Sequence, residues 1–154
     1  MKDLETIMDD IATIMKANIQ AYVTEVNAAK GDSLLPAFAA ADYHLWNLRD
    51  VPNKQISYLQ LIAQDPRINS ANASNLIIYY IQINTMWRIK DRDNIPKIKA
   101  RYHYIFSRIL AEKVAPKYPD IEITDLNSIL GQEEDTEDGL VEFITVTFTV
   151  SLAI

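Results

Sequence analysis

A strict alternation near the end of the chain is the feature that most constrains its fold. Residues 144–152 read ITVTFTVSL, in which large apolar residues alternate with threonine or serine. Because successive side chains of a β-strand point to opposite faces, this pattern predicts a strand, over 140–152, with one buried face. The apolar row consists of Ile144, Val146, Phe148, Val150 and Leu152. The hydroxyl row consists of Thr145, Thr147, Thr149 and Ser151.

The two rows predict different surroundings for the two faces of this strand. We expect the apolar row to lie against helices in the domain core. We expect the hydroxyl row to meet a neighbouring subunit, the lumen of a polar channel or water. We also expect the neighbour of this last strand to lie in another subunit.

Two helices are predicted from apolar residues spaced three and four apart. Over 3–29, one such row consists of Leu4, Ile7, Ile11, Ile14, Asn18 and Ala21, and a second row consists of Met8, Met15 and Tyr22. Gly31 supplies a stop for this helix. Packing on the domain's own sheet is favoured over a coiled coil, because fewer than four heptads are present and Asn18 is polar.

The second helix is predicted over 94–115. Asp93 or Asn94 can cap its start, and Pro96 suits the first turn, where its missing N–H does no harm. Its apolar face consists of Ile98, Tyr102, Ile105 and Ile109.

Three further strands, at 55–64, 75–90 and 120–130, complete the predicted order α-β-β-α-β-β. The fold class we predict is α+β: a single, mostly antiparallel four-stranded sheet with two helices packed on one face. The 154 residues fit a single domain, 1–154. It contains a long connection over 32–54 and an acidic hairpin loop over 131–139.

The connection over 32–54 is rich in apolar residues for a solvated loop. They are Phe38, Tyr43, Leu45 and Trp46. We expect them to pack on their own domain, with a partner-binding arm as the alternative.

Charge is concentrated in one short segment. Residues 133–138 contain five of the 21 acidic residues. The rest of the chain has 16 acidic and 15 basic residues, so it is nearly neutral. The five are Glu133, Glu134, Asp135, Glu137 and Asp138. A solvated hairpin tip is favoured over a calcium site, because the spacing of an EF-hand loop is missing. The nearly neutral remainder argues against tight, sequence-specific binding of nucleic acid.

Composition also bears on location. The chain has no cysteine, which fits a reducing compartment. Acidic residues in the first twenty positions argue against a secretory signal peptide. The apolar runs are shorter than the roughly 20 residues of a membrane-spanning helix, so we expect a soluble protein without membrane contact.

No pattern in the sequence predicts a catalytic, metal or cofactor site. His44 and His103 lack metal-ligand spacing, the G-x-S-x-G motif is absent, and three glycines cannot build a phosphate loop. The bases in 97–108 are interpreted as an ordinary exposed helix face rather than a nucleic-acid surface. We therefore expect no enzyme, no cofactor and no metal.

In size and order of elements, the chain resembles the tail terminator and related neck (head-tail joining) proteins of long-tailed bacteriophages. The resembling segments are LETIMDDIATIM, ISYLQLIAQ, LIIYYIQINTMWRI, IPKIKARYHYIFSRIL, DIEITDL and VEFITVTFTVSLAI. The resemblance implies a virion protein, assembled in the host cytoplasm as a homo-oligomeric ring, commonly a hexamer. Such a ring caps the tail tube and docks to the neck or connector, and DNA passes through it without being specifically bound.

The resemblance also implies places for two segments. The last strand would lie near a subunit boundary, and the acidic loop would face the channel or the next ring. The alternatives are another virion ring component, such as a head-completion adaptor or a tail-tube subunit, or a small intracellular ligand-binding domain or enzyme. A partner-binding adaptor that uses 32–54 is a further alternative.

Overall fold

The computed structural model describes residues 3–38, 43–45, 58–63, 67–69, 76–88, 92–118, 122–130, 134–136 and 139–153. Its main helices are α1 (Leu4–Lys30) and α2 (Ile95–Ile109). Three short helical segments flank α2: η2 (Arg92–Asn94), η3 (Leu110–Val114) and η4 (Ala115–Lys117). The strands are β1 (Tyr43–Leu45), β2 (Tyr58–Ala63), β3 (Arg67–Asn69), β4 (Leu76–Arg88), β5 (Glu122–Leu130), β6 (Glu134–Thr136) and β7 (Gly139–Ala153).

The predicted fold class, a four-stranded sheet with two helices, is wrong. Among residues whose side chains are described, 78% are helical and 7% lie in strands, so the fully placed part of the molecule is a pair of helices. The described strand backbones pair as seven strands, in the order β1-β2-β4-β7-β5, with β3 beside β4 and β6 beside β7. The prediction failed on the three-residue strands β1, β3 and β6, which are too short to show a period.

The sheet is built around one long antiparallel pair. β4 and β7 pair from Leu76 with Ala153 to Arg88 with Val141, and this ladder places Ile81 opposite Phe148. β5 pairs with the other edge of β7, and β2 with the other edge of β4. β1 runs parallel to β2. Because β4 and β5 occupy both edges of β7, the expectation that its neighbouring strand lies in another subunit is wrong.

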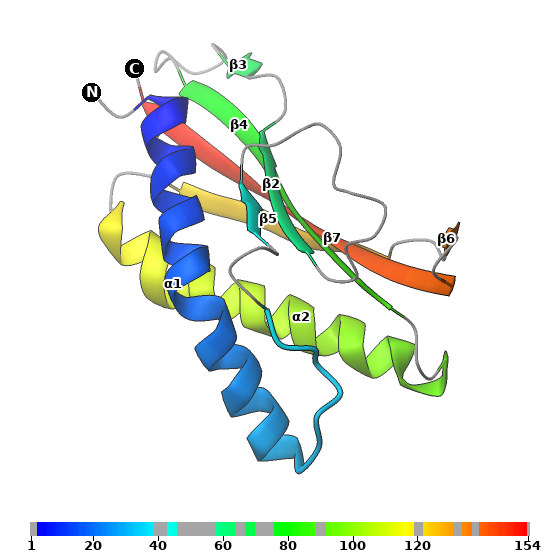
Figure 1. Ribbon diagram of the computed structural model, residues 1–154. Helices are drawn as coiled ribbons and strands as arrows, with labels where there is room; N and C mark the ends of the chain where they lie inside the picture. Colours follow the sequence, from blue (N-terminus) through cyan, green and yellow to red (C-terminus); the bar gives the residue numbers. More distant parts are fainter. Residues whose placement is uncertain are drawn as a thin grey trace.

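The two helices cross each other over the sheet (Figure 1). Their buried faces form one core cluster with Ile81, Ile83 and Phe148. Within this core, Tyr102 stacks on Phe106, with ring centroids 5.9 Å apart, and both side chains are fully buried. The core therefore lies between the helices and the central strands β4 and β7.

Local sequence explains both ends of α1. The Asp3 side chain accepts a hydrogen bond of 2.8 Å from the Thr6 N–H and caps the start of the helix. Gly31 ends it with a φ of 66°, a left-handed conformation that costs glycine little. The predicted bounds are thus off by one residue at each end.

The buried face of α1 is rotated from the one that the first apolar row indicated. Ala21 is exposed and Ile14 and Asn18 are only partly buried, whereas Met8 and Met15 are fully buried. The buried residues are Ile7, Met8, Ile11, Ala12, Met15, Ile19, Tyr22, Val23 and Val26. The row that we placed second therefore lies at the centre of the buried face.

The face of α2 agrees with the prediction, whereas its end does not. Ile98, Tyr102, Ile105 and Ile109 are all buried. The α-helix ends at Ile109 and continues as the π-helical turn η3 and the 3₁₀ turn η4, short of the predicted single helix to 115. Pro116 is the physical reason, because it lacks an N–H and its ring crowds the carbonyl four residues earlier.

The start of the connection 32–54 packs on α1. Asn27 exchanges two hydrogen bonds with the backbone of Leu35, of 3.0 and 3.1 Å, and the Phe38 N–H donates to Gln20 Oε1 at 2.7 Å. The Phe38 ring meets the edge of Tyr102 at 6.2 Å. Further along, Tyr43 and Leu45 lie in β1, and Trp46 lies outside the described residues.

The rotated face of α1 is tested by a pair of alanine substitutions on adjacent residues. Met15→Ala should lower the free energy of unfolding by about 2–5 kcal/mol, because it opens a cavity at a fully buried position. Ile14→Ala, at a partly buried position, should cost clearly less. Urea unfolding followed by circular dichroism measures both, and an equal or larger loss for Ile14→Ala would contradict this face.

Candidate functional site

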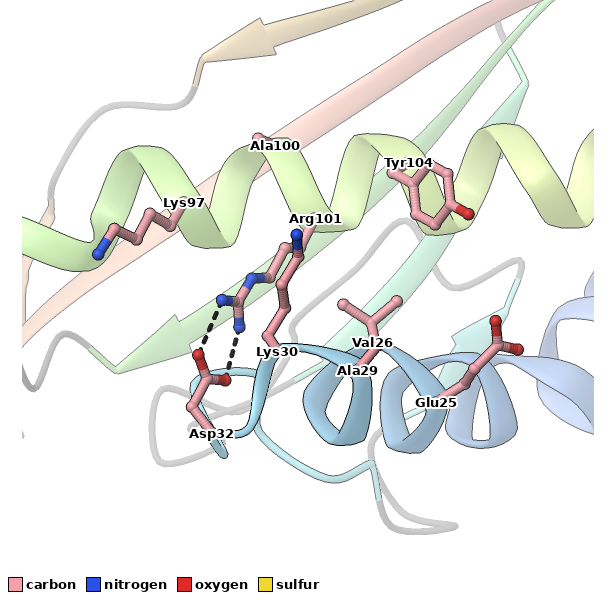
Figure 2. Close-up of a pocket in the computed structure, with 9 residues that line it drawn as sticks. All are labelled: Glu25, Val26, Ala29, Lys30, Asp32, Lys97, Ala100, Arg101 and Tyr104. Atoms are coloured by element: carbon pink, nitrogen blue, oxygen red, sulfur yellow. Dashed lines mark hydrogen bonds and ion pairs between the residues drawn. The ribbon is translucent and has the colours of Figure 1, made fainter.

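An open groove of about 780 Å³ lies between the C-terminal half of α1 and the first half of α2. Figure 2 shows the residues that line it. Val26, Ala29 and Ala100 are its small apolar residues. Its polar residues are Glu25, Lys30, Asp32, Lys97, Arg101 and Tyr104.

An ion pair between α2 and the residue after the α1 cap lies within this groove. Arg101 Nη1 and Nη2 donate to the two carboxylate oxygens of Asp32 at 2.7 and 2.8 Å, as the dashed lines in Figure 2 show. This two-point contact is the strong form of an arginine–carboxylate pair. The hydrogen bonds from Arg101 lower the pKa of Asp32 from 3.8 to about 2.

A second arginine, Arg108, bridges the helices beside the groove. Its guanidinium contacts Glu25 at 2.7 Å and Glu112 at 2.8 Å, and it lies 4.7 Å from the centre of the Tyr22 ring. Tyr22 Oη donates to Glu112 at 2.6 Å. This hydrogen bond, with burial, raises the pKa of Tyr22. Arg108 thus shares its single positive charge between the carboxylates of Glu25 and Glu112.

The groove also contains two lysines, Lys30 and Lys97. Lys30 and Lys97 are exposed, and within the described part of the chain neither forms an ion pair. Lys97 is near enough to Asp32 for its charge to help lower the pKa of that carboxyl. The lining residues comprise three cations, Lys30, Lys97 and Arg101, and two anions, Glu25 and Asp32, so the groove presents a net positive charge.

Tyr104 adds an exposed aromatic ring to the same groove. At 52% exposure it is the one large hydrophobic residue that is exposed among those described. Arg108 lies 5.5 Å from its ring centre. Tyrosine is enriched at protein interfaces because it combines an apolar ring with a hydroxyl. The groove thus combines a small apolar floor, two lysine ammonium groups and one tyrosine.

This arrangement can bind an anionic group, and it offers no catalytic pair. Its carboxylates are held by arginines, so neither is placed to act as a base. In the described ranges, no three histidine, cysteine, aspartate or glutamate side chains come together as a metal site would require. Nor does the described part contain a helix long and apolar enough to cross a membrane.

Among the described residues that the sequence singled out as candidate site residues, none lines this groove. Glu134 and Asp135 lie in β6, opposite Val141 and Leu140 of β7. Glu133, Glu137 and Asp138 lie outside the described residues. A channel or inter-ring role for this acidic segment stays a prediction.

The structure gives the backbone pairing of the hydroxyl row of β7. Thr145, Thr147, Thr149 and Ser151 pair with residues of β4 on one side and β5 on the other. The side chain of Thr149 is buried, with 5% exposed. Its role as a lumen or subunit contact stays a prediction, although Thr149 is already covered within the single chain.

The bases of α2 differ from the ordinary exposed face that we expected. The side chains of Arg101 and Arg108 are only 12% and 25% exposed, because both reach across to acidic residues. These acidic partners lie 69 and 83 residues away. The only sequence pattern near this site was Gly31, which indicated the end of the first helix just before Asp32. No spacing rule connects residues so far apart.

The ion pair between Arg101 and Asp32 predicts a pH-dependent coupling. A carboxyl whose pKa is lowered by folding adds stability above its unfolded pKa, and this contribution is lost as the pH falls from 3.8 to about 2. In a cycle of Asp32→Asn, Arg101→Gln and the double variant, the two substitutions should be coupled at pH 7 and independent below pH 2. Thermal unfolding measures each variant, and additive effects at pH 7 would contradict the pair.

Comparison with known proteins adds no family to this description. No model of a known protein family matches the chain, and a search of curated proteins finds no relative. The function is therefore inferred from the geometry of the described residues.

Proposed function

We propose that this chain is a virion structural protein, a tail terminator or neck protein whose copies form a ring on the phage tail tube and join it to the head connector. The observation that carries the proposal is the free edge of the sheet. β5, nine residues long, pairs with β7 and, among the described strands, with no other. A long edge strand presents unpaired N–H and C=O groups, which pair with another chain unless they are protected.

Ring closure is a natural way to protect such an edge. When each copy places the same two surfaces against its neighbours, the contacts repeat around an axis and end in a closed ring. The register shift between Thr124 and Asn127 bends β5 locally, as β-bulges do at sheet edges. A bend of this kind limits pairing to a partner of matching shape.

A ligand-binding domain or an enzyme is less well supported. Such a function needs an enclosed pocket with polar groups that converge on a ligand. The groove between α1 and α2 is open, and two of its charged side chains, Arg101 and Asp32, bind each other. A structural role therefore accounts better for the described surface.

Electron microscopy and native mass spectrometry test the proposed ring directly. The purified protein, alone or with tail-tube protein, should form closed rings of one subunit number with a central hole wide enough for duplex DNA. A monomer at micromolar concentration in both samples would contradict the proposal. Binding of the rings to the ends of tail tubes would distinguish a terminator or neck protein from a tube subunit.

The role of the β5 edge is tested by one added charge. Asn127→Lys, at the register of Thr147, should weaken assembly by roughly tenfold, because lysine on an edge strand disfavours pairing with a further strand. Ala17→Lys, on an exposed part of α1, is the matched control and should assemble normally. Sedimentation velocity measures assembly, and circular dichroism shows that both variants fold. Equal assembly of the two variants would contradict an edge-to-edge contact at β5.

A further inference from the structure

The groove between α1 and α2 lacks a partner for its excess charge. Lys30 and Lys97 line it together with the exposed ring of Tyr104. Neither lysine is paired within the described part of the chain. A matching occupant must therefore carry carboxylates or another anion, and it must fit an open groove rather than a closed pocket.

The same chain contains a segment of complementary charge. Residues 131–139 read GQEEDTEDG and carry five acidic residues with no basic residue among them. Part of this segment, β6, pairs with the first residues of β7. Figure 1 shows β6 at the end of the sheet where β7 begins, apart from the C-terminal end of α1. Lys30 is the last residue of α1, so β6 of the same copy lies away from this end of the groove.

We infer that the groove receives the acidic segment 131–139 of a neighbouring copy. Acidic residues of this segment pair with the ammonium groups of Lys30 and Lys97, and the segment lies against the ring of Tyr104. The Asp32–Arg101 pair fixes the end of α1 against α2 and so keeps the groove open. This inference deepens the proposed ring, on which it rests, by naming the two surfaces that meet.

The proposed contact joins two different surfaces, the groove of one copy and the acidic segment of the next, as contacts within a ring do. Each copy offers its groove to one neighbour and its acidic segment to the other, and contacts of this kind close into rings. The pairs lie at the surface, so the contact steers and orients the subunits more than it holds them. Salt should weaken it, because about 0.15 M ionic strength screens charges beyond roughly 8 Å.

A peptide titration tests the groove without any need for a ring. A fluorescent peptide of sequence GQEEDTEDG should bind the wild-type chain, and the variant Lys30→Gln/Lys97→Gln should bind it at least tenfold more weakly. Lys16→Gln/Lys113→Gln removes two exposed lysines elsewhere on the helices and serves as the matched control. No binding, or equal binding by both variants, overturns the inference. So does a groove that ignores the peptide and binds a short DNA duplex through the same two lysines.

Charge reversal tests the contact between copies. Lys30→Glu/Lys97→Glu and Glu134→Lys/Asp135→Lys should each assemble poorly, whereas an equimolar mixture, or all four substitutions in one chain, should assemble again. The reversed positions 134 and 135 then face the reversed positions 30 and 97 with opposite charges, so rescue supports the inference. Rings that form normally in both single-surface variants overturn it and leave the proposed ring intact. If the wild-type chain forms no ring, the proposed function fails, and the peptide titration still decides whether the groove binds the segment.

Discussion

Burial of the two helices against the central strands is the interaction on which the rest of the structure depends. Tyr102 and Phe106 of α2, fully buried and stacked, lie in one cluster with Met8 and Met15 of α1. Ile81 and Phe148, paired across β4 and β7, complete this cluster from the sheet side. Apolar burial of this extent is the dominant favourable contribution to folding. It also sets the separation of the helices and therefore the groove between them.

Charged contacts connect the helices and their flanking turns around the apolar core. Arg108 connects Glu25 of α1 with Glu112, and Tyr22 donates to the same Glu112. Near the other end of α1, Asp10 accepts a hydrogen bond from the Tyr118 hydroxyl and lies 2.8 Å from the ammonium of Lys117. Exposed pairs of this kind contribute little stability individually. They lie at both ends of the helix crossing, where they add polar contacts to the apolar packing.

The sheet and the helix layer support the proposed ring in different ways. Among the described strands β5 has one unpaired edge, which can offer backbone groups to another chain, whereas the groove offers charge to a side-chain partner. Edge pairing provides affinity with little choice of partner, and charge complementarity provides orientation and selectivity. The proposed ring uses both.

Local sequence determined the elements whose signals are repeated within one segment. The alternation in 144–152, the apolar face of α2 and the stop at Gly31 are each readable from neighbouring residues, because the strand period, the helix period and left-handed glycine are local properties. Tertiary structure alone decided which strands pair, where α1 is buried and how the groove is formed. β1, β3 and β6 become strands because longer strands pair with them, and Asp32 meets Arg101 because the crossing of the helices brings together residues 69 apart. Strand pairing and ion pairing depend on which residues lie close together in space, and local sequence patterns do not show this.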